Sequence, residues 1–464
     1  MKRLFLAALT FTVAAAAVFA EINFSGNGSA TIVPFGVRFG DPAETVTSSE
    51  VRWGDDGPRV QLVANGQNEA GTIGAVVALN ADGHGLAIDD NAKVWLKPSS
   101  VFKVTLGKFI EDDLRFKIGV SGGGFHNYLL YIRGDNLDES AFFSRFKTTG
   151  FGTHVAFTPG NLYIGAAIGS DFDKRSVKEL REDGALDAWA NIQAGIGYKI
   201  DNVGFVRALF NGPKPTNEDG SDVEGFKATG AEATGRSPTF QVGFQLTAVK
   251  GLNIDLAGQI PLPYEYKQYS TPEVVIANLT EQRPYIIGLG FDTTLPTIPL
   301  RFYGRLSGKL GAYDETTLTD DYYTRINDPT VEKTVKVKKG DNVLFSFTPM
   351  YTVSPGWIIG LEYMLDVQFG SDVAARSSTG AVGGDVDKQY LEYWAEKTKN
   401  GGDDAKKAAE LKNNYIDNGI GLFVRHNFAG GDVRFGATVK LPGGEAHEGA
   451  KPQLFFPIIL NYNF

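Results

Sequence analysis

Residues 239–260 read TFQVGFQLTAVKGLNIDLAGQI, and their alternation of apolar and polar side chains decides the fold. Every second residue from Phe240 to Ala248 is apolar, and the residues between them are glutamine, glycine or threonine. The same alternation returns in residues 252–260, after the short link 249–251. Because successive side chains of a strand point to opposite faces, this stretch predicts a hairpin of two strands, each with one apolar and one polar face.

The same pattern recurs in residues 300–310 and 433–441, where the polar face carries full charges as well as glycine. A soluble antiparallel sheet would also alternate. Nothing else in the chain, however, supplies a second layer to cover so much apolar surface. Lipid can cover it, and strands of about 9–11 residues with apolar residues outside and polar residues inside are typical of a transmembrane β-barrel.

Short and long connections alternate along the chain, as periplasmic turns and external loops do in such barrels. The tight turns are expected at 98–100, 159–161, 201–202, 249–251, 296–299, 354–356 and 429–431. The long polar links are expected at 39–50, 81–91, 110–145, 170–187, 212–236, 262–282, 311–340, 370–415 and 442–450. The resulting fold class is all-β, a single antiparallel up-and-down barrel of about 18 strands, with 16 as the alternative. The least certain strands are 93–97 and those in 51–80.

The N-terminus predicts export. Lys2 and Arg3 precede an uncharged apolar stretch, residues 4–18, and a cleavage site after Ala20, which together are typical of a signal peptide. The rest, residues 21–464, shows no linker and is expected to be one barrel domain. The chain has no cysteine and a net charge of −9, which argues against a disulfide-stapled protein and against a general nucleic-acid partner.

The C-terminal stretch 454–464 reads LFFPIILNYNF. Its alternate residues Phe464, Tyr462 and Leu460 resemble the terminal strand of bacterial outer-membrane proteins, where a final Phe is read by the barrel-assembly machinery. Residues 97–109, KPSSVFKVTLGKF, resemble a hairpin of porin-like barrels, including spirochaete ones. The resemblance implies an outer-membrane location, with outer-membrane lipid and the assembly machinery as partners. It implies no substrate.

In general porins the loop after the fifth strand folds into the lumen and forms the constriction. By the strand count, residues 110–145 hold that place, and an ordinary external loop is the alternative. The constriction candidates are Glu111, Asp112, Asp113, Arg115, Arg133 and Asp135.

Alternation also predicts which charges face the lumen. The candidates are Lys93, Lys103, Arg207, Asp255, Arg301, Arg305, Lys309, Glu362, Asp366, Arg425, Arg434 and Lys440. Charged rings in low-dielectric walls focus the field in a pore. We expect acids of the 110–145 loop to face the basic wall and to give a modest anion preference. The alternative is that these charges only solvate a wide aqueous lumen.

Other chemistry has weak support. The five histidines are scattered, so no metal site and no cofactor is predicted. His154 lies on a predicted strand, but no sequence signal brings a nucleophile and a carboxylate to it, so an enzyme is not expected. One or two helices are predicted in 386–412, inside the external loop 370–415. Aromatic residues near strand ends predict an interfacial girdle of Trp95, Tyr351, Trp357 and Tyr462.

The function predicted from these features is an outer-membrane channel for passive diffusion of small hydrophilic solutes. A transporter of hydrophobic compounds is one alternative, although alternation begins already at Ile22 and leaves no room for an N-terminal hatch. A surface adhesin or binding barrel is the other. A homotrimer is possible, because a lipid face and a subunit face have the same apolar pattern.

Overall fold

The computed structural model describes residues 21–40, 44–46, 59–82, 85–116, 144–148, 151–170, 192–212, 237–271, 274–326, 332–372, 414–447 and 450–464. The predicted signal peptide, Arg133, Asp135 and the predicted helices in 386–412 lie outside these residues. Among the described helices, none is both long and apolar enough to cross a membrane.

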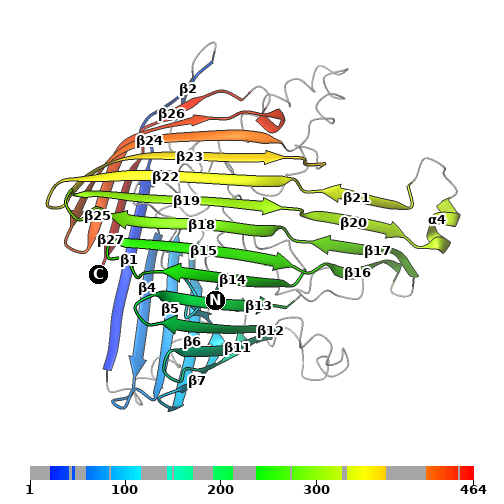
Figure 1. The fold of residues 1–464 in the computed structure, drawn as a ribbon, viewed down its shortest axis with the longest axis horizontal. Coiled ribbons are helices and arrows are strands. Elements are labelled where there is room, and N and C mark those ends of the chain that lie inside the picture. Colours follow the sequence, from blue (N-terminus) through cyan, green and yellow to red (C-terminus); the bar gives the residue numbers. More distant parts are fainter. Residues whose placement is uncertain are drawn as a thin grey trace.

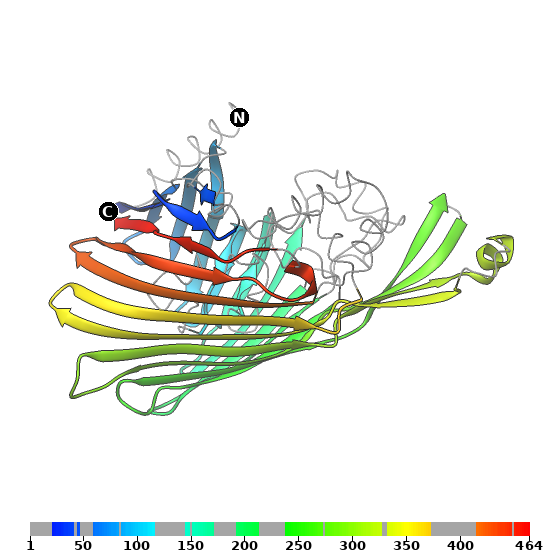
Figure 2. The ribbon, with the colours of Figure 1, turned by 90° about the horizontal axis from the view of Figure 1, so that it is seen from above.

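A closed antiparallel barrel of 18 strand positions forms the body of the molecule (Figures 1 and 2), which confirms the predicted fold class and strand number. Its strands are β1 (Glu21–Ile32), β4 (Arg59–Gln67), β5 (Ile73–Asp82), β6 (Gly85–Ser99), β7 (Phe102–Lys108), β10 (Phe151–Phe157), β11 (Leu162–Ser170), β12 (Ile192–Ile200), β13 (Gly204–Asn211), β14 (Thr239–Leu246), β15 (Leu252–Pro261), β18 (Tyr285–Thr294), β19 (Leu300–Leu310), β22 (Asp341–Ser354), β23 (Trp357–Phe369), β24 (Tyr415–Phe428), β25 (Gly431–Leu441) and β27 (Ile458–Asn463). The short strand β26 (Gln453–Phe455) precedes β27 and also pairs with β25, while β2 (Gly36–Arg38) pairs with β26 and with β3 (Glu44–Val46).

The barrel closes where its two ends meet. Strand β1 pairs with β4 on one side and with β27 on the other. The last residue extends this seam, because the Phe464 amide donates to the Gly26 carbonyl at 2.9 Å and the Gly26 amide donates back at 2.8 Å. A Cβ on Gly26 would lie 2.6 Å from the Phe464 ring, so the glycine leaves the space that the ring occupies.

The two faces of the strands differ as the alternation predicts. Leu256 and Leu306 point outward and are 49% and 46% exposed, whereas Asp255 and Arg305 point inward and are 0% and 3% exposed. The outward apolar surface therefore belongs to the side that lipid would cover, and the polar side chains line the lumen.

Tight turns join the strands at one end of the barrel. Seven lie at the positions predicted from the sequence, and an eighth, residues 68–72 between β4 and β5, was not predicted. Backbone geometry explains two of them: Asn202 and Gly251 adopt φ of 58° and 80°, a left-handed conformation that Asn and Gly tolerate best. Aromatic side chains gather on the outer face at this end. The rings of Phe428, Tyr462 and Phe464 stack in a row at 6.3 and 6.2 Å.

The predicted girdle is correct on this side of the barrel except for one residue. Tyr351 and Trp357 are 47% and 40% exposed on the outer face. Trp95, however, pairs with Gly74 on the face that also carries Lys93, which is the lumen face. Trp95 is therefore not part of the girdle.

Three links expected to be long and polar are largely ordered strand. Between β5 and β6 only 83–84 separate the strands, and a register shift between Val77 and Leu79 takes up the additional residues of β6. The links 262–282 and 311–340 form β16 (Tyr264–Thr271), β17 (Val274–Gln282), β20 (Tyr313–Leu318), the helix α4 (Asp320–Ile326) and β21 (Thr334–Lys338).

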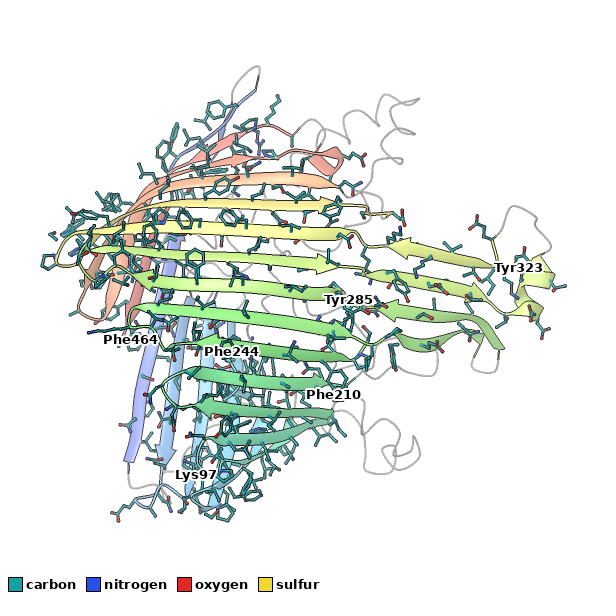
Figure 3. The ribbon with its side chains drawn as sticks, in the orientation of Figure 1. Lys97, Phe210, Phe244, Tyr285, Tyr323 and Phe464 are labelled. Carbon is teal, nitrogen blue, oxygen red and sulfur yellow. The ribbon has the colours of Figure 1, made fainter. Side chains whose placement is uncertain are left out.

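These elements form a separate four-stranded sheet, here called the extension, in the order β16-β17-β20-β21. Figures 1 and 2 show the extension projecting well beyond the barrel at the end opposite the tight turns. In Figure 3, Tyr323 of α4 marks its tip and Phe464 marks the other end of the molecule.

Candidate functional site: the lumen and its inward segment

The inner wall of the barrel carries the predicted lumen charges. Alternation along the paired strands places all of them on the inward face, opposite outward residues such as Leu306, Leu361 and Phe435, which are 46%, 46% and 42% exposed. The residues so placed are Lys93, Lys103, Arg207, Asp255, Arg301, Arg305, Lys309, Glu362, Asp366, Arg425, Arg434 and Lys440. These side chains come from β6, β7, β13, β15, β19 and β23–β25, so the charges are distributed around the wall.

Between β7 and β10 the chain turns back against this wall. The described parts of this connection, residues 109–116 and 144–148, are here called the inward segment. Its two arms contain β8 (Ile110–Glu111) and β9 (Phe146–Lys147), which pair with each other, and the Thr148 amide donates to the Phe109 carbonyl at 3.0 Å.

Four apolar side chains anchor the inward segment. Phe109, Leu114, Phe116 and Phe146 are at most 1% exposed. They pack on inward residues of the wall: Ala156, Tyr163, Ala167, Phe205, Leu209, Ala257 and Ile286. Burying such a side chain is worth about 1.5–3 kcal/mol. The ion pairs that also hold the segment are largely buried, so the cost of removing their charges from water offsets much of their attraction. The apolar anchors therefore dominate the attachment.

Glu111 is attached to the wall by charge. Its carboxylate accepts from Lys93 Nζ at 3.2 Å, from Lys103 Nζ at 3.0 Å and from Thr105 Oγ1 at 3.2 Å, and its side chain is only 8% exposed. Burial alone would raise the pKa of this carboxyl, but the two ammonium groups outweigh it and hold the pKa below its ordinary value. Lys93 also donates to the carbonyl of Ile110 at 3.0 Å.

His154 of β10 lies under the same segment. Its Nε2 is 3.0 Å from the hydroxyl of Tyr163, and its ring centroid is 4.6 Å from that of Phe146. His154 and Tyr163 are both buried. These contacts make His154 part of the wall on which the segment packs.

Arg207 of β13 clamps the middle of the segment. Its guanidinium lies 3.6 Å from the centroid of the Phe116 ring and donates to the carbonyl of Leu114. The returning arm has its own polar contacts. Ser144 Oγ donates to Gln241 Oε1 at 2.7 Å, and the Lys147 amide donates to Gln193 Oε1 at 2.9 Å.

Three predicted constriction residues differ from Glu111. Asp112 and Arg115 form an ion pair at 3.2 Å with side chains 47% and 35% exposed, and Asp113 is also exposed. The segment therefore turns one acid into the wall and leaves two acids and one arginine in contact with solvent.

Ion pairs gather where the inner wall approaches the tight turns. Arg301 bonds Asp292 through Nε at 2.7 Å and through Nη2 at 2.5 Å. Asp432 lies 2.6 Å from Arg434 Nε and 3.5 Å from Arg425 Nη2. The exposed fractions differ within each pair: 49% for Arg301 against 20% for Asp292, and 25% and 14% for Arg425 and Arg434 against 9% for Asp432. The cations are thus the more accessible partners.

Sequence reasoning missed a second contact between a loop and the inner wall. The short 3-10 helix η2 (Glu445–His447) places His447 Nε2 at 2.9 Å from Asp417 Oδ2, with both side chains fully buried. The Ala446 amide donates to the Asn414 carbonyl at 2.9 Å. Alternation could have placed Asp417 inward, but nothing in the sequence indicates its partner. Within the part of the chain that the structure describes, no group of three or more His, Asp or Glu side chains is suited to a metal ion.

Comparison with known proteins gives neither a matching family model nor a matching curated protein. Solved structures of outer-membrane porins resemble the chain. An anion-selective porin from Comamonas acidovorans has a TM-score of 0.41 at 11% identity and covers 96% of this chain and 100% of its own. Pseudomonas aeruginosa OpdK with vanillate has a TM-score of 0.43 at 8% identity and covers 95% and 98%. Salmonella typhi OmpF with daunomycin has a TM-score of 0.41 at 9% identity and covers 96% and 97%.

The chain's own closed strand pairing, charged lumen and outward apolar face define its fold class, a porin-type antiparallel β-barrel. The narrower resemblance of 97–109 to spirochaete porins is not supported by the comparisons.

Proposed function

We propose that the protein is an outer-membrane channel through which small hydrophilic solutes diffuse passively, with a modest preference for anions. The observation that carries this proposal is the inward segment, which packs against the charged inner wall of a closed barrel. A segment held against the inner wall would narrow the path of a solute through the lumen. The proposal involves no catalytic step and no cofactor.

The anion preference rests on which charges solvent can reach. In the ion pairs of Glu111, Asp292 and Asp432 the carboxylates are less exposed than the cations that hold them. Glu111 and Asp432 each face two cations. A solute in the lumen therefore meets more accessible positive than negative charge, and the low-dielectric wall strengthens that field.

The remaining features of the proposal concern assembly. Residues 1–20 would be removed as a signal peptide after export, and the terminal strand with Leu460, Tyr462 and Phe464 would be read by the barrel-assembly machinery. Three barrels could associate through their outward apolar faces in outer-membrane lipid.

Single-channel recording from the purified protein in a planar bilayer tests the channel directly. We expect discrete current steps whose size rises with salt concentration, because ions would cross an aqueous lumen. Protein unfolded by boiling in detergent is the control. A correctly folded barrel that gives no steps contradicts the proposal.

A surface-binding barrel is the second candidate function, and the observation that favours it is the extension. Its four strands project from the barrel at the end opposite the tight turns. If binding is the main role, removing the extension abolishes attachment to the partner surface, whereas the channel predicts that conductance survives this removal.

A further inference from the structure

Glycines of the inner wall lie directly beneath the apolar anchors of the inward segment. A Cβ on Gly195 would lie 2.5 Å from Leu114 Cδ1 and 3.0 Å from Phe146 Cζ. A Cβ on Gly165 would lie 2.9 Å from the Phe146 ring. Real Cβ atoms essentially never come closer than 3.0 Å to a neighbour, so a larger residue at either position must shift the tips of the Leu114 and Phe146 side chains. Both side chains are fully buried and have little room to rotate away, so we expect the shift to be passed on to the segment.

Two more positions repeat this arrangement. A Cβ on Gly197 would lie 2.6 Å from the ring of the wall residue Phe205 and 2.9 Å from Leu114 Cδ2, and one on Gly243 would lie 2.6 Å from Phe116 Cζ. The positions come from β11, β12 and β14, and all face the lumen. We call Gly165, Gly195, Gly197 and Gly243 the glycine sockets.

Strand glycine in general does not explain the sockets. Glycine weakens a strand and commonly marks a close approach of another part of the molecule. On the outward face next to the sockets the chain uses full-sized residues, Ile164, Ile196 and Val242. Gly258 of β15, which points outward, would give its Cβ only ordinary contacts at 3.4 and 3.6 Å. Close contacts also occur on the outer face, as between a Cβ on Gly304 and the Phe291 ring at 2.4 Å, but there the ring belongs to the adjacent strand. The close contacts with the inward segment lie on the inner face.

We propose that the glycine sockets are positioning residues of the channel, which seat Leu114, Phe116 and Phe146 and make the inward segment a fixed shelf of the lumen wall. Arg207, which pairs with Gly243 in the wall, also holds Phe116, because its guanidinium lies 3.6 Å from the centroid of that ring. The consequence for ion flow rests on the proposed function, whereas the seating of the segment does not.

A thiol reporter tests the seating without reference to conduction. The chain has no cysteine, so Ser144→Cys introduces a single thiol. Ser144 is 1% exposed in the returning arm, and the thiol is expected to react slowly with a maleimide in the folded barrel. Adding Gly195→Val should speed this labelling about tenfold, because displacing the segment opens its buried contacts. The matched control Gly258→Val makes the same change on the outer face and should leave the rate unchanged.

A double variant, Gly195→Val with Leu114→Ala, distinguishes a specific contact between these two residues from a general disturbance of the barrel wall; it is called the volume swap. Gly195→Val adds as many carbon atoms as Leu114→Ala removes, and volume-conserving changes are tolerated best in packed sites. The double variant should therefore label more slowly than either single variant. If Gly195→Val labels no faster than its control, or if the effects of the two changes simply add, the sockets do not position the segment.

A second variant covers the case in which Gly195→Val fails to assemble. Leu114→Ala leaves the wall glycines intact and must still speed maleimide labelling of the Ser144→Cys thiol, because the socket of Leu114 is then empty. Unchanged labelling contradicts the proposal.

Single-channel recording in bilayers gives an independent measurement. Gly195→Val should convert steady current steps into currents that fluctuate between levels, and the double variant Gly195→Val with Leu114→Ala should restore steady steps. Absence of current in the unaltered protein would refute the proposed channel, while labelling would still decide the sockets.

Discussion

Glu111 links the position of the inward segment to its charge. Its carboxylate lies against Lys93 and Lys103 and is therefore not available as the acidic side of a field across the lumen. Asp112 is exposed and remains available for that role, whereas the Asp113 carboxyl accepts a hydrogen bond from Tyr163 and burial raises its pKa. At this position the acidic loop and the basic wall neutralise each other, and one positive charge is left over.

The lowered pKa of Glu111 predicts how the segment responds to acid. A carboxyl whose pKa is lowered by folding stabilises the folded form above its unfolded pKa, and this contribution is lost as the pH falls through the folded pKa. Channel conductance should therefore be steady from about pH 7 to pH 5 and become unsteady only in acid below the ordinary glutamate pKa of about 4.3. Conductance recorded as a function of pH checks this.

Glu111→Gln is the decisive variant for this prediction. It removes the charge that Lys93 and Lys103 hold, so its conductance should lose the acid transition and be unsteady at neutral pH too. Asp112→Asn is the matched control, because Asp112 is exposed and should leave the transition in place. A Glu111→Gln channel that responds to acid as the unaltered channel does would show that another group is responsible.

For single residues, the sequence predicts which face of a strand a side chain lies on better than it predicts which side chains contact each other. Alternation places Lys93 and Lys103 on the lumen side, and the strand count places Glu111 in a loop expected to enter the lumen. That these three side chains meet depends on how the chain turns after Lys108, which no local pattern encodes. The sockets could not be predicted, because alternation can place Gly195 and Gly197 on the inward face but does not show which loop residues pack on them.

At the scale of elements, the extension shows why polar composition led to loops being predicted where the structure has strands. Residues 264–271 and 334–338 are rich in polar residues and were expected to be loops. Each strand of the extension continues the chain of a barrel strand, so its backbone groups can pair with a neighbour that is already aligned. The alternation of Val335 and Val337 with lysine and threonine was a strand signal within the linker.

Removing the extension should leave the barrel intact. Replacing 264–282 and 313–338 with tight turns keeps the ladders β15–β18, β18–β19 and β19–β22, which pair along their length without the extension. We expect unchanged single-channel conductance and a thermal unfolding midpoint within a few degrees of that of the full chain. A variant that lacks only α4 serves as the control for loop replacement. Loss of conductance on removal of all four strands would show that the extension is part of the channel.

At the scale of the whole molecule, the two ends of the chain form one seam. The rhythm of turns and links predicts 18 strands, and the pairing of β1 with β27 confirms it. The terminal Phe464, singled out as an assembly signal, also takes part in the seam through Gly26. Connections that fold inward, such as the one holding His447, could not be predicted, because their contacts join residues far apart in the chain.

The distribution of charge over the whole molecule gives the last prediction. The chain carries a net charge of −9, yet the accessible charges in the described lumen are mainly cations. Reversal potentials in a salt gradient should therefore show anion preference. The preference should be clear near 0.1 M salt, where the screening length is about 10 Å, and nearly vanish at 1 M, where it is about 3 Å.

Arg425→Gln combined with Arg434→Gln tests whether the wall, and not the net charge, sets this preference. The double variant leaves Asp432 without its two cations, so the reversal potential should move toward cation preference. Lys250→Gln changes one charge in the exposed tight turn between β14 and β15 and should have little effect, although it too makes the chain more acidic. Cation preference in the unaltered channel, or equal shifts per charge removed in the two variants, would mean that the lumen arginines do not select the solute.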